Sequence, residues 1–346
     1  AKPGFGPVVT GTIVGGSGRR DAQVRVLPSG KLARVRGIQV HGASVDTARA
    51  GTRCALNLAG VELGELGRGI VVADPRLERV ACNVDSLVTL ARHAPRVPGS
   101  HQRVRFHAGT AETFARIVWL DAATPEAGGE ALAQLRLATP VPLLRGDRFI
   151  LRSEEARVTL GGGVVLDPGS ARRGARQPER RARLSRLAEA DEATTLEIWL
   201  AARGAAGWQL AELAEQLAQA PETLLERLAG RTDIARSELG TSTWIAAASA
   251  MDALRAQVLS ALDAFHRDRA SQTAMPLATL RARLCPGLDA RAFRALIDRL
   301  CAAGETQLTG DGVKLSAHSQ RLSAEEEALA ARVVASLSHG SAPSPK

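Results

Sequence analysis

The side chains best suited to binding chemistry in this sequence are arginines, which supply 41 of the 45 basic residues and leave a net charge of +9. They are densest at 171–186, where seven arginines stand against one glutamate. Guanidinium groups bind phosphate oxygens in a bidentate manner, and crowded like charges are unfavourable without anionic neighbours. This segment is therefore predicted to contact RNA, with a merely solvated linker as the alternative. The predicted contacts are Arg172, Arg173, Arg176, Arg180, Arg181 and Arg183.

Motifs for phosphate transfer, hydrolysis and metal binding are absent from the sequence. It contains no GxxxxGK(S/T) loop and no NKxD motif, which nucleotide binding by a GTPase requires. The glycine run at 161–163 lacks a lysine and is predicted to form a tight turn. The seven histidines form no HExxH or His-x-His cluster. We therefore predict no catalytic residue, no metal and no cofactor in this chain, which favours a binding module over an enzyme.

The cysteines and the hydropathy point to a cytoplasmic protein. Cys54, Cys82, Cys285 and Cys301 form no CxxC pair and lie in apolar runs, which predicts reduced core thiols. No run approaches the roughly 18 apolar residues of a membrane span, and the first residues do not resemble a signal peptide. We expect a monomer without a membrane partner.

In the first half of the chain, the candidate polar residues are expected to lie on β-strands. Short alternating segments separated by Gly and Pro predict two β-barrels, at 1–75 and 76–170. In 52–59, Cys54, Leu56 and Leu58 share one face and Arg53 lies on the other, and a β-bulge is predicted at Gly37. The predicted strands are 8–14, 22–27, 31–40, 52–59 and 69–73, then 84–90, 102–107, 113–120, 131–137, 147–152 and 164–166.

The second half changes to a helical period with a weak internal repeat. LAELAEQL (210–217) is echoed by LATLRARL (277–284), and each copy ends in a hairpin-like segment, which predicts tandem winged helices. The fold class is thus β followed by α: two barrels, the Arg-rich linker at 171–186, and winged helices at 187–248 and 249–320. Residues 321–346 are expected to begin a third winged helix and end in a tail. The third helix of the first copy, PETLLERLAG, carries two glutamates and one arginine, so this copy is interpreted as a spacer or a protein-contact domain.

Several segments resemble a known family. GFGPVVTGTIVGG (4–16), VRVLPSGKLARVRGIQVHG (24–42) and ARAGTRCALNLAGVELGELGRGIVV (48–72) are similar to the β-barrel second domain of translational GTPases. FHAGTAETFARIVWLD and LLRGDRFILR resemble the following barrel. The Arg-rich linker and the winged helices after it are an order typical of the selenocysteine-specific elongation factors, the SelB family, and not of elongation factor Tu.

Such a resemblance implies a fragment of that family, without its N-terminal GTPase domain and its last winged helices. GTP and Mg would belong to that GTPase domain, so this chain alone is expected to be inactive. The implied partners are selenocysteinyl-tRNA, the ribosome and, for the full-length factor, the messenger selenocysteine-insertion hairpin. The alternatives are a winged-helix transcription regulator with a β-rich sensor domain and another two-barrel translational GTPase, such as the initiation factor that carries initiator tRNA.

The resemblance also implies roles for individual residues. Arg53 matches an arginine that helps to form the pocket for the selenocysteinyl group, and a permanent cation there would favour an anionic selenol over a neutral serine hydroxyl. Arg34 and Arg36 are candidates for the acceptor end of the tRNA. The second barrel supplies candidates for the tRNA stem, namely His107, Gly109 and Thr110.

Overall fold

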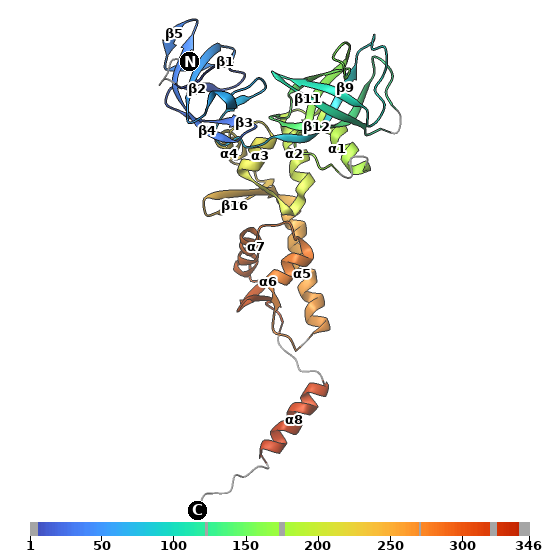
Figure 1. The fold of residues 1–346 in the computed structure, drawn as a ribbon. Coiled ribbons are helices and arrows are strands. Elements are labelled where there is room, and N and C mark those ends of the chain that lie inside the picture. Colours follow the sequence, from blue (N-terminus) through green and yellow to red (C-terminus); the bar gives the residue numbers. More distant parts are fainter. Residues whose placement is uncertain (1–5, 122–123, 173–176, 270, 319–323, 339–346) are drawn as a thin grey trace, which may run out of the picture. The chain divides into compact units, whose positions relative to one another are not determined.

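The computed structural model describes residues 6–121, 124–172, 177–269, 271–318 and 324–338, and its chain runs from strands to helices (Figure 1). This order confirms the predicted fold class. The chain divides into two compact units, residues 1–195 with 214–220, and residues 196–213 with 221–346. None of the described helices is both long enough and apolar enough to cross a membrane.

The first domain is a six-stranded antiparallel sheet with a small ribbon beside it. Its strand path is β1-β7-β4-β3-β8, with β5 paired to β4, and β2 pairs with β6. The register of β4 on β7 shifts between Val35 and Gly37, which confirms the predicted bulge. Val26, Ile38 and Leu58 are almost fully buried in its core. The strands are β1 (Val8–Thr12), β2 (Ser17–Arg19), β3 (Gln23–Leu27), β4 (Lys31–Val40), β5 (Ala43–Val45), β6 (Thr47–Arg49), β7 (Arg53–Ala59) and β8 (Val71–Ala73).

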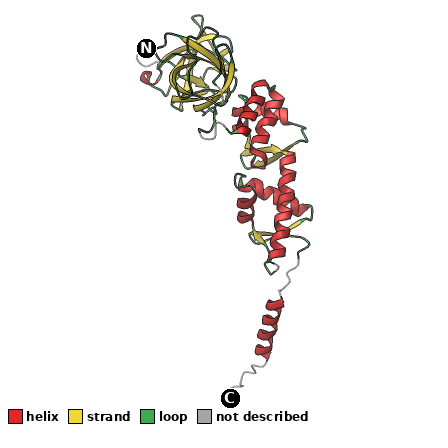
Figure 2. Ribbon diagram, turned by 90° about the vertical axis from the view of Figure 1, so that its right-hand side faces the viewer, coloured by secondary structure: helices red, strands yellow, loops and turns green. Residues whose placement is uncertain are grey.

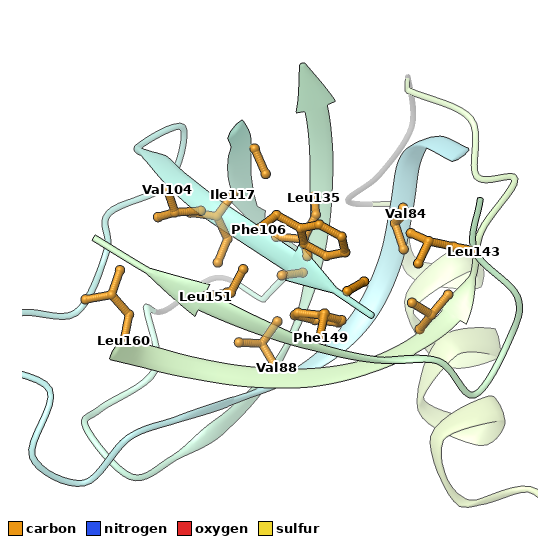
Figure 3. Packing of buried hydrophobic residues seen from close by; sticks show 14 of the residues in the cluster. Val84, Val88, Val104, Phe106, Ile117, Leu135, Leu143, Phe149, Leu151 and Leu160 are labelled. Carbon is orange, nitrogen blue, oxygen red and sulfur yellow. The ribbon is translucent and has the colours of Figure 1, made fainter. Parts of the chain in front are cut away.

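The second domain is a closed barrel with the strand order β10-β11-β12-β9-β14-β13. Residues at alternate positions fill its interior, and the rings of Phe106 and Phe149 stack there with centroids 5.1 Å apart (Figure 3). Closure leaves no strand edge unpaired. The strands are β9 (Ala81–Leu90), β10 (Arg103–Ala108), β11 (Ala111–Trp119), β12 (Glu130–Val141), β13 (Arg148–Arg152) and β14 (Thr159–Asp167).

The glycine run at 161–163 lies inside β14, so the predicted tight turn is wrong. A Cβ atom on Gly163 would lie 2.2 Å from the carbonyl oxygen of Leu87, and one on Gly161 would lie 2.3 Å from that of Thr89. These distances are far below van der Waals contact. The run therefore allows β14 to approach β9 closely, which is a role of glycine inside strands.

The predicted linker at 171–186 is helical over much of its length. Helix α1 (Pro178–Glu189) covers the outer face of β9, β12 and β14. Leu184 and Leu187 on α1 are fully buried, and Arg145 donates a 2.9 Å hydrogen bond to the Leu187 carbonyl at the end of the helix. This part of the Arg-rich segment thus belongs to the second domain.

Two winged helices follow, with the same order of elements in each (Figure 2). Each has a three-stranded sheet, β15-β17-β16 in the first and β18-β20-β19 in the second. The first contains α2 (Glu192–Arg203), β15 (Trp208–Gln209), α3 (Leu210–Gln216), α4 (Pro221–Leu228), β16 (Ile234–Leu239) and β17 (Ser242–Ala247). The second contains α5 (Ala248–Asp268), β18 (Met275–Pro276), α6 (Leu277–Leu284), α7 (Ala290–Ala302), β19 (Thr306–Thr309) and β20 (Gly312–Leu315). A further helix, α8 (Ala324–Ser338), lies in the segment 321–346 that was expected to begin a third winged helix.

Candidate RNA-binding site

Arg53 is the first residue of β7, and its side chain points away from the core of the first domain. Cys54 and Leu58 on the same strand are buried, and Thr12 of β1 lies directly opposite Arg53. Arg53 is exposed, and in the part of the chain that the structure describes no carboxylate pairs with it. The guanidinium is therefore a permanent positive charge that is available to a ligand.

Arg34 and Arg36 are both exposed on β4, but their surroundings differ. Arg34 donates a 2.9 Å hydrogen bond to Asp21 and lines a surface hollow of about 520 Å³ with Gln23 and Leu32. Arg36 is the extra residue of the bulge, and its guanidinium has no carboxylate partner among the described residues. Arg36 is thus the freer cation of this pair.

His107, Gly109 and Thr110 meet at one end of the second barrel. His107 lies on the outer face of β10, with Nδ1 3.9 Å from a carboxylate oxygen of Glu112. Gly109 and Thr110 form the turn between β10 and β11, and Gly109 has a φ of +56°. The three predicted residues are therefore neighbours on one hairpin.

Arg180 is not available to RNA, which corrects the prediction for this residue. Its Nε and Nη2 atoms each donate a 2.8 Å hydrogen bond to Asp85, and Nη1 donates one of 2.7 Å to the Ala171 carbonyl. Arg180 is 8% exposed and Asp85 is fully buried. Burial raises the pKa of the Asp85 carboxyl, and the Arg180 charge opposes this effect. The guanidinium that was predicted to bind phosphate instead forms an ion pair that holds α1 against the second barrel.

The remaining arginines of the segment differ in their surroundings. Arg181 lies 2.7 Å from Asp121, and Arg183 lies 3.7 Å from Asp167. Both are partly exposed, where ion pairs contribute little stability. Arg172 is exposed. Arg173 and Arg176 lie outside the described residues.

Comparisons with protein-family models match two parts of the chain, the second barrel and the second winged helix. Residues 85–172 match the domain model "Selenocysteine-specific elongation factor, beta-barrel domain", and residues 259–315 match "Elongation factor SelB, winged helix". The selenocysteine-specific elongation factor of Desulfomicrobium baculatum is 30% identical over 94% of this chain and 52% of its own length. That of Escherichia coli (strain K12) is 29% identical over 94% of this chain and 50% of its own. The chain is thus similar to selenocysteine-specific elongation factors over 94% of its length.

A solved structure supports the fold of this chain. The crystal structure of a bacterial selenocysteine-specific elongation factor, EF-Sec, superposes with a TM-score of 0.66 at 20% identity and covers 98% of this chain and 51% of its own. The chain thus spans about half the length of the relatives it matches.

The third helices of the two winged helices are poorly placed for reading nucleic acid. Helix α4 carries Glu222 and Glu226 beside Arg227. On α7, Arg291 donates a 3.0 Å hydrogen bond to the Leu239 carbonyl and Arg299 one of 3.1 Å to the Arg236 carbonyl. Since these carbonyls belong to β16 of the first copy, α7 packs against the other winged helix.

The described residues do not fit a nucleotide or a metal ion. Across the described ranges, no group of three or more His, Cys, Asp or Glu side chains is arranged to hold a metal. The phosphate-binding loop that GTP and its Mg²⁺ require does not occur in the sequence. We therefore derive no step through GTP or Mg²⁺ from this chain.

The cysteines only partly follow the prediction of core thiols. Cys54 is buried, and burial raises the pKa of its thiol. Cys285 and Cys301 are partly buried. Cys82 is exposed on β9 next to Ala81, where the register of β12 on β9 shifts and the strict alternation of the strand is interrupted.

Proposed function

We propose that the two barrels of this chain bind selenocysteinyl-tRNA for delivery to the ribosome at UGA codons. The single observation that carries the proposal is Arg53, an exposed arginine without a carboxylate partner in the described structure, in a chain similar to selenocysteine-specific elongation factors. In this proposal Arg53 faces the selenocysteinyl group, Arg34 and Arg36 face the acceptor end, and the hairpin of His107, Gly109 and Thr110 faces the tRNA stem.

The proposed chemistry of Arg53 is selection of an anion over a neutral group. A selenol is largely ionised at neutral pH, whereas the hydroxyl of serine is not. A nearby opposite charge favours the ionised form of a group, and the arginine guanidinium stays protonated throughout the physiological range. Arg53 would therefore stabilise bound selenocysteinyl-tRNA more than seryl-tRNA.

GTP hydrolysis is not assigned to any residue of this chain. Under this proposal, GTP-dependent release belongs to the part of the longer relatives that this chain does not cover. The winged helices are proposed to lead toward the messenger hairpin, with the first copy as a spacer.

Replacement of Arg53 tests the proposal. We expect the Arg53→Ala variant to bind uncharged tRNA as the wild type does, and to lose its preference for selenocysteinyl-tRNA over seryl-tRNA. The measurement is fluorescence anisotropy with the three tRNA forms at one salt concentration. Arg36→Ala, which removes the same charge from the neighbouring strand β4, is the matched comparison: as a proposed acceptor-end contact it should weaken all three forms equally and leave the preference unchanged. An equal loss for all three forms in Arg53→Ala would show that Arg53 contacts phosphate instead.

A further inference from the structure

A row of arginines crosses the outer face of the second barrel. Arg103 on β10 lies directly opposite Arg116 on β11, and Arg116 lies directly opposite Arg136 on β12. We call Arg103, Arg116 and Arg136 the arginine row. The interior positions of these strands are apolar, so the three side chains are on the outside. Like charges directly opposite each other on neighbouring strands are destabilising, so the row requires an explanation.

Only one end of the arginine row is neutralised by a carboxylate. Arg103 lies 3.1 Å from Glu154, and its guanidinium covers the ring of Phe114 at 3.6 Å. Arg116 donates only to the His101 carbonyl, at 3.4 Å. Arg136 donates to the side-chain oxygen of Gln134 at 2.9 Å. Within the described ranges, neither Arg116 nor Arg136 forms an ion pair.

The Arg-rich segment extends the row on the other side. Arg136 donates a 3.2 Å hydrogen bond to the carbonyl of Arg172, whose own side chain is exposed. Burial and the positive charges of Arg172 and Arg180 lower the pKa of Arg136. The charge of Arg180 is balanced by Asp85, whereas those of Arg116, Arg136 and Arg172 have no such balance in the described structure.

We propose that the arginine row, together with Arg172, binds the phosphate backbone of an RNA helix. Guanidinium groups on a rigid sheet suit phosphate oxygens in geometry and charge. An acidic protein surface is the weaker fit, because protein interfaces centre on apolar and aromatic anchors. The aromatic ring of Phe114, beside the row, is already covered by Arg103. The inference rests on the proposed function in assuming an RNA partner. It adds Arg103, Arg116 and Arg136 to Arg172, which is the one member of this surface among the predicted contacts.

The test compares the Arg116→Gln/Arg136→Gln double variant with wild-type chain, using a fluorescent RNA hairpin of mixed sequence as the probe. We expect the double variant to bind about tenfold more weakly at about 50 mM salt, because lost phosphate contacts release fewer counterions. The slope of log affinity against log salt should flatten by about one for each arginine removed. Arg116→Lys/Arg136→Lys should retain most of the slope, because it keeps the charge.

The matched control is Arg269→Gln/Arg283→Gln, which removes the same charge from exposed positions on the second winged helix. This control should bind the hairpin as the wild type does. Wild-type affinity and slope in the Arg116→Gln/Arg136→Gln variant would overturn the proposal, as would a wild-type chain that does not bind the hairpin at low salt. The two proposals can also fail separately. If the hairpin binds through the row but Arg53→Ala leaves the preference for selenocysteinyl-tRNA unchanged, the proposed function is refuted and the arginine row is not.

Discussion

The two barrels use arginine in opposite ways. In the first, Arg53 projects from β7 into solvent, and no described carboxylate balances it. In the second, Arg180 is buried and held by both oxygens of Asp85. A charge that is satisfied inside the protein has no counterions to release, so it adds nothing to RNA affinity. For RNA binding, it therefore matters more whether an arginine is exposed and without a carboxylate partner than how many arginines a domain contains.

The strongest test of this contrast is the replacement of Asp85. We expect Asp85→Ala to lower the free energy of unfolding by about 3–5 kcal/mol, because it leaves the buried charge of Arg180 without its carboxylate partner. Urea denaturation of the whole chain, followed by circular dichroism, measures this loss.

Two further variants make the contrast sharper. Arg181→Ala removes a partly exposed arginine from the same helix and should cost about 1 kcal/mol or less. Asp85→Leu/Arg180→Met replaces the ion pair by apolar side chains and should recover most of the lost stability. If Asp85→Ala unfolds at the same urea concentration as wild type, Arg180 is not confined to the protein and its RNA role must be reconsidered.

The two domains also differ in how closely the backbones of neighbouring strands approach each other at their glycines. Glycine substitutions in each domain test this difference. Gly163→Ala in the second barrel places a methyl group against the Leu87 carbonyl and should cost about 3 kcal/mol of stability. Gly37→Ala at the bulge of the first domain meets no atom within 4 Å and should cost less than about 1 kcal/mol. Thermal denaturation of both variants gives the comparison, and equal losses would contradict it.

The smallest effect is expected at Arg53 itself. Because its side chain is exposed and has no described ion pair, Arg53→Ala should change the free energy of unfolding by less than about 0.5 kcal/mol. The same denaturation experiment measures it. A loss well above that value would mean that Arg53 pairs within the folded chain, which would remove the contrast between the barrels.

Local patterns in the sequence predicted much of the fold. The alternation of Cys54, Leu56 and Leu58 placed Arg53 on the outer face, and the phase change around Gly37 predicted the bulge. The repeated order of helices and hairpins predicted the winged helices. These features depend on neighbours within a few residues, which is the range over which side-chain periodicity carries information.

Features that depend on distant pairing were not predictable in this way. Arg180 meets a carboxylate 95 positions away, so its segment was predicted to contact RNA. The glycine run looked like a turn because the carbonyl of Leu87 that it accommodates is on another strand. Arg103, Arg116 and Arg136 form a row only through the register of three strands, and no spacing along the chain reveals that register.

The two winged helices share one hydrophobic core, in which Leu239 and Trp244 of the first copy join Val258 and Phe293 of the second. The bonds from Arg291 and Arg299 to carbonyls of the first copy hold the same interface. The shared core makes the pair one stiff unit, as the proposed spacer role requires, rather than two domains joined by a flexible tether. The length of the pair is fixed when it folds, so ordering it costs no further entropy at the moment of binding. A binding module attached at the far end of the pair would be held at a fixed distance from the barrels' end of the pair. Its effective concentration would be high for a binding site at that distance and close to zero for other sites.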